Sequence, residues 1–426
     1  MNGSVSVRDR LWQHIAAIRM IDTHEHIPSE SSACQSHTSL FSFFEHYVSS
    51  DLVSAGMPRE SLEAMRKPDS GLSLEERWAI LEPYWPFART TGYGRAMLEY
   101  IADLYGVVDI NRDTYLDLCQ RIKAAHKPGW YRHVLKEKAG IDLSLVITWP
   151  RQSVVVDQEF FRAVPILDHY AIVSTRAELE ALEKESGYAI QTLPQLMEAQ
   201  EAALDRFAGQ GIAGVKIFLA YRRTLLFERA PQSAAARVFD RVWLSQTQDL
   251  AFEDLKPLQD FMTRRLIGLA AERGLPIQIH TGLQEGNGNY IENSRPTLLS
   301  NLFMEFSDAR FDVFHAGYPY SGEVAVLSKM FPNVYADLCW IHAVSPLAAT
   351  RILGEWLEVI PSNKIFAAGG DSNYVEGAYE HCKIARRVAH EVLSQKVEGG
   401  YLSEEEARWL ADRILRENAA SLFRLG

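Results

Sequence analysis

The sequence predicts an α/β protein, a (β/α)8 TIM barrel with a helical insertion after the first strand. Three observations support this fold class. Eight short apolar runs recur along the 426 residues, longer amphipathic stretches follow most of them, and the interval 25–142 is rich in helical patterns. Parallel neighbouring strands need a crossover connection, usually a helix, so this alternation is typical of a barrel.

The runs predicted as strands are mostly apolar on both faces, as buried parallel strands are. They cover residues 20–24, 143–149, 163–173, 213–221, 275–280, 310–315, 333–340 and 364–371. Helix-like segments lie between them, for example at 193–210, 258–274, 323–331 and 349–360. No repeat or low-complexity linker divides the chain, so we predict a single barrel over residues 1–426.

The interval after the first strand carries no strand pattern. Its sequence, such as LSLEERWAILEPYWPFARTTGYGRAMLEYIADLYG at 72–106, is helical in pattern and aromatic. Barrel enzymes build their sites from the loops that follow the strands. We therefore predict a helical insertion over residues 30–135 that forms a lid over the site.

Charge and cysteine content narrow the class of partner. The chain has 44 basic and 55 acidic residues and a net charge of −11, without long runs of one sign. This argues against nucleic acid or an anionic membrane, and favours a small-molecule partner. The four cysteines are far apart and suggest neither a zinc ribbon nor a disulfide framework.

The N-terminal segment has no apolar signal region, and no stretch approaches the ~20 apolar residues of a membrane span. We expect a cytoplasmic protein that forms a homo-oligomer.

Four histidines and one aspartate fall at predicted strand ends. His24 and His26 close the first strand, His280 the fifth, His315 the sixth and Asp371 the eighth. Catalytic residues of a barrel lie at the C-terminal ends of its strands, whereas the opposite end serves stability. One strand-end histidine is more often a core or rim residue, but the whole set predicts a shared site.

These residue types suit a divalent metal ion. Side chains two positions apart in a strand share a face, so His24 and His26 can both point to the barrel mouth. Two imidazoles from one strand, a third from across the barrel and a carboxylate are typical of zinc, with a position open for water. Such an ion would activate that water, and Asp371 is placed to take its proton.

Lys216 lies inside the predicted fourth strand, in GVKIFLAY, between apolar neighbours. Burying an unpaired ammonium is costly, so this lysine must pair with a carboxylate, lose its charge or be modified. Carboxylated by carbon dioxide, it is an anion able to bridge two metal ions. Otherwise it can pair with Asp371, hold a substrate carboxylate, or snorkel from a strand end.

Candidate substrate-binding residues follow other strands. Arg222 and Arg223 follow the fourth strand in AYRRTL, and Arg151 follows Trp149 in TWPRQ. The planar fork of arginine binds carboxylates in a bidentate way, so all three arginines are candidates for holding an acidic substrate, and we favour Arg222 and Arg151. Trp149 and Tyr318 are candidates for lining the same site.

With these residues in place, the chain resembles the amidohydrolase superfamily, in its amidohydrolase-2 type, which includes uronate isomerases and aromatic-acid decarboxylases. The resemblance rests on HEH at 24–26, His280, His315 and GGDSN around Asp371. The C-terminal half is more specifically similar to the amidohydrolase-like domain that nodulin/FluG-type proteins carry fused to a glutamine-synthetase-like domain. The segments that carry this likeness are GVKIFLAYRRTL (214–225), QIHTGLQEGNG (278–288), VFHAGYPYSGEVAVLSKMFPNVYADL (313–338) and EEEARWLADRILRENAASLFRL (404–425).

The resemblance implies a divalent metal, usually zinc, held by His24, His26, His280 and Asp371. In the superfamily, the histidine that matches His315 binds a second metal or polarises the substrate. A carboxylated lysine marks the two-metal members. We expect one ion, with Lys216 as a candidate second-site ligand.

We predict a metal-dependent hydrolase in which metal-activated water attacks an amide or ester/lactone carbonyl of a small carboxylate-bearing substrate. Asp371 moves the proton, His315 polarises the carbonyl, and γ-glutamyl amides are among the compounds to test. The alternative is a non-hydrolytic isomerase or decarboxylase, similar to uronate isomerases, because a metal can polarise a carbonyl and a hydroxyl without using water. A third hypothesis is a non-catalytic scaffold that has kept the barrel.

Overall fold

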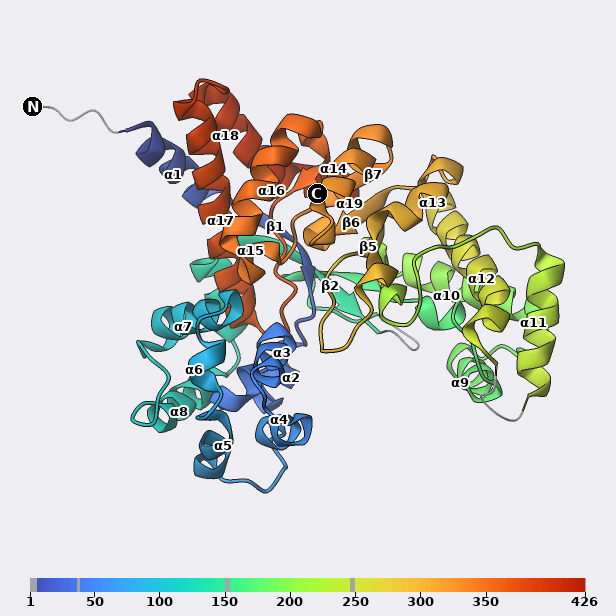
Figure 1. The fold of residues 1–426 in the computed structure, drawn as a ribbon, viewed down its shortest axis with the longest axis horizontal. Helices are drawn as coiled ribbons and strands as arrows, with labels where there is room; N and C mark the ends of the chain where they lie inside the picture. Colours follow the sequence, from blue (N-terminus) through green and yellow to red (C-terminus); the bar gives the residue numbers. More distant parts are fainter. Residues whose placement is uncertain (1–5, 37–38, 150–153, 246–249, 426) are drawn as a thin grey trace, which may run out of the picture.

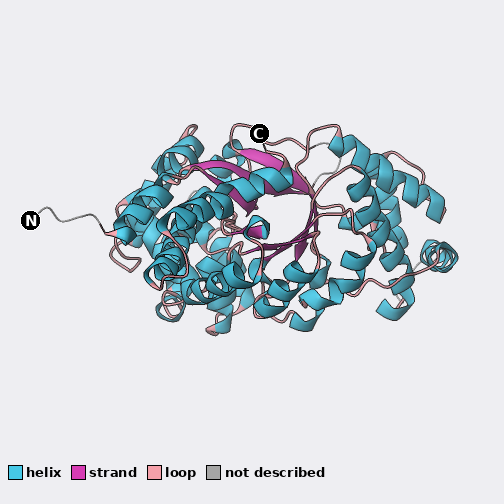
Figure 2. Ribbon diagram, turned by 90° about the horizontal axis from the view of Figure 1, so that it is seen from above, coloured by secondary structure: helices cyan, strands magenta, loops and turns pink. Residues whose placement is uncertain are grey.

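The parallel strands form the predicted barrel, which Figure 2 shows as a ring surrounded by helices. The computed structural model describes residues 6–36, 39–149, 154–245 and 250–425. Its strands are β1 Met20–Glu25, β2 Ile141–Thr148, β3 Phe161–Pro165, β4 Val215–Ile217, β5 Ile277–His280, β6 Phe311–Phe314, β7 Val334–Asp337 and β8 Ile365–Phe366. They pair in the orders β1-β2-β3 and β4-β5-β6-β7-β8, all parallel.

Two backbone links connect these two sets of strands. A parallel bridge between Ile166 and Lys216 joins the end of β3 to β4. The amide of Thr23 in β1 donates to the carbonyl of Ala368, 3.0 Å away in the chain that follows β8. The fold class predicted from the sequence, with its helical insertion after the first strand, is therefore confirmed.

Helices alternate with the strands around the barrel (Figure 1). Those of the insertion are α2 Glu30–Ser36, η1 Leu40–Phe43, α3 His46–Ser54, α4 Arg59–Arg66, α5 Leu74–Leu81, α6 Trp85–Ala88, α7 Gly92–Tyr105, α8 Tyr115–Ala125 and η2 Arg132–Lys138. The others are α1 Val7–Ala17, η3 Asp168–Tyr170, α9 Arg176–Ser186, α10 Leu193–Ala208, η4 Leu219–Tyr221, α11 Gln232–Leu244, α12 Phe252–Glu272, η5 Ile291–Ser294, η6 Pro296–Leu299, α13 Ser300–Glu305, η7 His315–Gly317, α14 Ser321–Met330, α15 Ile341–Val344, α16 Pro346–Val359, η8 Ser362–Lys364, α17 Val375–Glu398, α18 Glu404–Asp412, η9 Arg413–Glu417 and α19 Asn418–Phe423. Among the described residues, no helix is long and apolar enough to cross a membrane.

Side-chain caps explain where several helices begin. Ser73, Thr175 and Ser403 each precede a helix and accept a hydrogen bond from the amide of a glutamate three residues later. That glutamate bonds back to the amide of the cap residue. Each of these capping boxes satisfies two amides that the first turn would leave unpaired, so the sequence determines the start of α5, α9 and α18.

Some strands end earlier than the sequence predicts. The third and fourth predicted strands continue to residues 173 and 221, whereas β3 ends at Pro165 and β4 at Ile217. The eighth was predicted to reach residue 371, whereas β8 ends at Phe366. The residues that follow are largely buried in turns and loops. The apolar pattern therefore marks burial rather than strand pairing at these ends.

The insertion packs against the barrel through α17. Helix α7 lies beside α17, and in Figure 1 the blue and cyan helices gather below it. Glu376, in the first turn of α17, is fully buried and accepts hydrogen bonds at Oε1 from His126 (2.8 Å), Tyr105 (2.6 Å) and Trp130 (2.7 Å). Burial alone would raise the pKa of Glu376, but these donors lower it to about 2. An ionised carboxylate thus joins the insertion to the barrel.

Candidate metal centre

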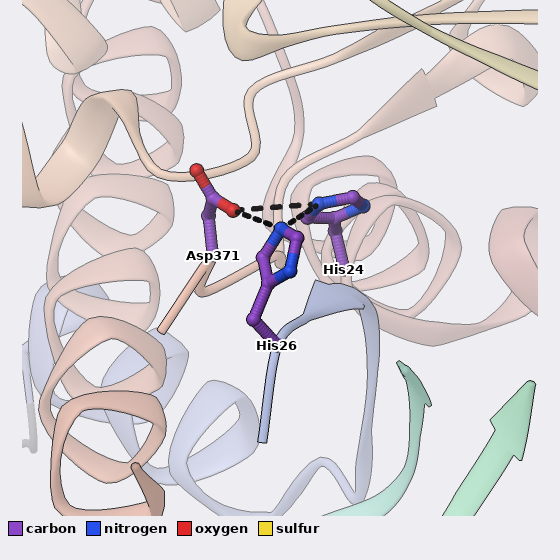
Figure 3. A group of neighbouring side chains, drawn as sticks. All are labelled: His24, His26 and Asp371. Atoms are coloured by element: carbon purple, nitrogen blue, oxygen red, sulfur yellow. Dashed lines mark hydrogen bonds and ion pairs between the residues drawn. The ribbon is translucent and has the colours of Figure 1, made fainter. Parts of the chain in front are cut away.

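Three predicted ligands meet at the mouth of the barrel. His24 is the fifth residue of β1, His26 follows the strand, and Asp371 comes from the loop after β8. The Nε2 atoms of the two histidines are 3.3 Å apart, and Asp371 Oδ1 lies 3.4 Å from His24 Nε2 and 3.3 Å from His26 Nε2. Figure 3 shows the three side chains pointing toward one another. In the part of the chain that the structure describes, this is the group suited to hold a metal ion.

The spacing of these atoms fits a divalent metal. Ligands arranged tetrahedrally at about 2.0–2.1 Å from zinc lie about 3.3–3.4 Å from one another, which matches the edges of this triangle. His24 and Asp371 are buried, whereas the His26 side chain is 24% exposed. An ion held here would therefore be shielded by protein on one side and open to small molecules on the other.

A buried amide sets the protonation of His24. Gln278, in β5, donates from Nε2 to the carbonyl of Thr23 (2.8 Å) and to Asp312 Oδ2 (2.9 Å). Its Oε1 must therefore accept from Nδ1 of His24, 3.1 Å away. The proton of His24 is held at Nδ1, which leaves a lone pair on Nε2 for a metal.

Asp371 has a strained backbone and an ionised side chain. Its φ of 53° lies in the left-handed region, which non-glycine residues seldom adopt. Burial alone would raise the pKa of this carboxyl, but His46, His315, His24 and His26 hold it well below its usual range. While Oδ1 faces the two β1 histidines, Oδ2 lies 3.7 Å from His46 Nε2 and 3.8 Å from His315 Nε2.

Lys216 is the central residue of β4 and lies beside this group. It is 3% exposed, so it does not snorkel to solvent. Its Nζ is 2.9 Å from His24 Nε2 and 4.6 Å from the centre of the Phe314 ring. Burial lowers the pKa of Lys216 to about 8, partly offset by Asp371. Burial and the Lys216 charge also lower the pKa of His24 to about 3.

The remaining predicted histidines lie next to the triangle but not in it. The rings of His280 and His315 are 4.3 Å apart. His280 ends β5, and its Nε2 donates to the carbonyl of Leu283 (3.1 Å). With Nε2 donating to Leu283, the ring nitrogen of His280 that is left for a metal ion is Nδ1. Burial lowers the pKa of both imidazoles well below the usual value, so both are neutral near pH 7.

Two of the predicted substrate-binding residues share a cavity whose lining does not include His24, His26 or Asp371. Trp149 and Arg222 line one cavity of about 290 Å³ with His169 and Glu178. The Arg222 side chain is 55% exposed and lies 3.7 Å from Glu178. Arg223, also a candidate for holding the substrate, is instead buried and paired with Asp260, so its role is structural. A role for this cavity in substrate binding stays a prediction.

Tyr318 and Arg151 are the remaining predicted substrate-site residues. Tyr318 is half-buried, and its carbonyl accepts from the amide of Leu283 (2.6 Å) in the loop after β5. Arg151 lies outside the described residues. A role for either side chain in substrate binding stays a prediction.

Sequence reasoning missed two residues that act on the triangle. His46 begins α3 of the insertion and reaches Asp371 only through the packing of distant segments. No local pattern indicates it. Gln278 could have been found, because a polar residue inside the apolar run LPIQIH, two positions before His280, must face the barrel interior.

Backbone strain is concentrated around the same group. Among the described residues, His46, His315, Trp340 and Asp371 all have φ between 53° and 71°. The rings of His315 and Trp340 are 4.8 Å apart, and His46 and His315 both face Asp371 Oδ2. Strained non-glycine residues persist only where the surroundings hold them, and they cluster at functional sites.

Comparison with known proteins gives a relative in sequence and neighbours in fold. A relative of known sequence, Protein fluG of Emericella nidulans, is 28% identical over 248 residues, which are 56% of this chain and 29% of that protein. This chain thus matches less than a third of that relative's length.

Two solved structures share the fold over almost their whole length. Uronate isomerase from Thermotoga maritima superposes with a TM-score of 0.80 and 16% identity, covering 98% of this chain and 97% of that one. Glucuronate isomerase from Caulobacter crescentus gives a TM-score of 0.78 and 16% identity, with 98% and 94% coverage. At this identity the likeness shows the fold alone. The family model described as Amidohydrolase matches residues 187–425, more than half of the sequence, and the chain belongs to that family.

Proposed function

We propose that this protein is a metal-dependent hydrolase that acts on an amide or ester/lactone carbonyl of a small carboxylate-bearing substrate. The observation that carries the proposal is the triangle of His24, His26 and Asp371, whose edges of 3.3–3.4 Å suit one divalent ion, with zinc our choice. When bound, such an ion polarises a carbonyl and lowers the pKa of water. Membership of the amidohydrolase family supports metal-dependent catalysis in general.

Asp371, His315 and Lys216 would each have a separate role in hydrolysis. Asp371 is ionised and keeps Oδ2 turned away from the two β1 histidines, so it can accept the proton that the attacking water loses. His315, neutral and fully buried, is placed to orient the carbonyl. The Lys216 ammonium is a cation close enough to the triangle to attract a substrate carboxylate.

The proposed reaction adds water across the bond. The water oxygen bonds to the carbonyl carbon, the bond to the amine or alcohol breaks, and Asp371 returns a proton to the leaving group. The products are a carboxylic acid and an amine or alcohol.

A second candidate is a non-hydrolytic isomerase or decarboxylase on the same site. It is favoured by His46, which the insertion brings to 3.7 Å from Asp371 Oδ2. Hydrolysis with His315 beside the same oxygen leaves this second imidazole without a role. The similarity of fold to uronate isomerases covers the insertion as well as the barrel, which is compatible with either reaction.

The experiment that separates these candidates is turnover in ¹⁸O-labelled water. The zinc-loaded protein is offered γ-glutamyl amides, lactones, uronates and aromatic carboxylates, with Asp371→Asn as the inactive control. Hydrolysis must place one label in the product acid. A product that forms only with the wild-type protein and has no new carboxyl group carrying ¹⁸O from the water would contradict the hydrolase proposal and support the second candidate.

A further inference from the structure

Glu25 stands between the two candidate metal ligands in the sequence, but it contacts a different part of the molecule. It is fully buried at the end of β1. Its Oε2 accepts a hydrogen bond from the backbone amide of Ser372, 2.6 Å away. Ser372 is the residue that follows Asp371, so Glu25 holds the chain on one side of that aspartate.

Asp22 holds the chain on the other side of Asp371. Its Oδ1 accepts from the amides of Gly370 (3.1 Å) and His24 (3.2 Å), and its Oδ2 accepts from the hydroxyl of Ser144 (3.1 Å). Asp22 is fully buried, and after burial itself the nearby Asp22 charge raises the pKa of Glu25. Two acidic side chains of β1 therefore bind the amides on both flanks of Asp371.

The backbone of Asp371 itself completes this arrangement. Its amide donates to the carbonyl of His24 (2.8 Å), so three successive amides, at residues 370, 371 and 372, bond to β1. A Cβ added at Gly370 would lie 1.9 Å from Glu25 Oε1, so this position accepts only glycine while the glutamate is in place. The φ of 53° at Asp371 needs such support, because left-handed backbone is unfavourable for an aspartate.

We propose that Glu25, together with Asp22, is a positioning residue that holds Asp371 in its left-handed conformation and so aims Oδ1 at His24 and His26. This inference rests on the proposed metal site. It assigns the central residue of HEH to the geometry of the third ligand rather than to contact with metal or substrate. Loss of the Glu25 acceptor should therefore weaken metal binding, whereas a side chain that keeps the acceptor should not.

The test is titration of the metal-free protein with Co²⁺, followed by its visible d–d absorption, for wild type, Glu25→Ala, Glu25→Met and Glu25→Gln. In the alanine and methionine variants we expect the Kd for Co²⁺ to rise about 10- to 100-fold, as for other residues that orient metal ligands. We expect a changed absorption spectrum in both. Gln keeps a carbonyl oxygen for Ser372 and an amide that can donate to Asp22, so its Kd and spectrum should match the wild type.

A matched control is Asp260→Ala. Asp260 is also buried and also accepts from a backbone amide, that of Glu228 (3.0 Å), but it lies on α12 and pairs with Arg223. This variant should lose thermal stability without a change in Co²⁺ affinity. Methionine is included because it fills the space of Glu25 and keeps the variant folded where alanine fails.

The outcomes are distinguishable. Wild-type Co²⁺ affinity in both Glu25→Ala and Glu25→Met, or in whichever of them folds, would overturn the positioning role. Failure of Glu25→Gln to restore binding would overturn it too, because the charge rather than the acceptor would then matter. If the wild-type protein itself binds no Co²⁺, the proposed metal site is wrong and the inference falls with it.

Discussion

Replacing Gln278 by methionine tests whether a buried amide prepares His24 for metal. Methionine has a similar length but neither accepts from His24 Nδ1 nor donates to Thr23 and Asp312. Three buried partners, at 3.1, 2.8 and 2.9 Å from the amide, lose their hydrogen bond. At about 1 kcal/mol or more for each, the free energy of unfolding should fall by about 3 kcal/mol. With the tautomer of His24 no longer fixed, the Kd for a divalent ion should rise about 10- to 100-fold.

The assay combines urea denaturation of the metal-free protein with Co²⁺ titration of the folded protein. Gln259→Met is the matched control, because Gln259 is also buried and hydrogen bonded, to Arg223 (3.3 Å) and Ser174 (3.4 Å), on α12. The control should lose stability and keep its affinity for Co²⁺. The reasoning is refuted if Gln278→Met binds Co²⁺ as tightly as the wild type, or if both variants lose affinity equally.

Three further predictions concern charge. Glu376 has a pKa of about 2 in the folded protein against a usual 4.5, so its contribution to stability is complete above pH 4.5 and is lost as the pH falls from 4.5 toward 2. In Glu376→Gln, this loss of about 3 kcal/mol in the free energy of unfolding should disappear from that pH window, as measured by denaturation at each pH. An unchanged pH profile would contradict this. Lys216→Met removes a positive charge 2.9 Å from His24 Nε2 and should lower the Kd for Co²⁺ at least about tenfold. Weaker binding would instead identify Lys216 as a ligand. Arg222→Ala should leave Co²⁺ affinity and stability unchanged and raise KM, with kcat constant, for the substrate found by the labelling experiment; an unchanged KM would remove the 290 Å³ cavity from the substrate site.

Much of the fold was predictable because buried parallel strands have a strong local signature. The eight apolar runs correspond to the eight strands, and Lys216 lies inside β4 as expected. The strand ends were less predictable. Leu219 in η4 and Ala367 after β8 are buried although neither belongs to a strand, so hydrophobicity alone cannot show where pairing stops.

The candidate site was predictable only where local geometry determines it. His24 and His26 converge because alternation along β1 places them on one face, and the structure brings Asp371 to both. The left-handed turn at Asp371 depends on contacts with Asp22 and Glu25, which are more than three hundred residues away in sequence. The arrival of His46 likewise depends on the packing of the insertion, which no motif encodes.

The direction of a loop side chain is not encoded locally either. Arg222 follows β4 as predicted, and after η4 its side chain lies 3.7 Å from Glu178. An arginine near a strand end thus suggests a ligand without showing which cavity it faces.

The most direct test of the central claim is the metal content of the purified protein, measured by elemental analysis beside His26→Ala and Asp371→Ala. We predict about one divalent ion per chain in the wild type after incubation with zinc and removal of the excess, since the triangle offers one set of ligands. Both variants should retain less than about a tenth of that amount, because each loses one of three ligands. Equal metal in all three proteins, or none in the wild type, would contradict the account.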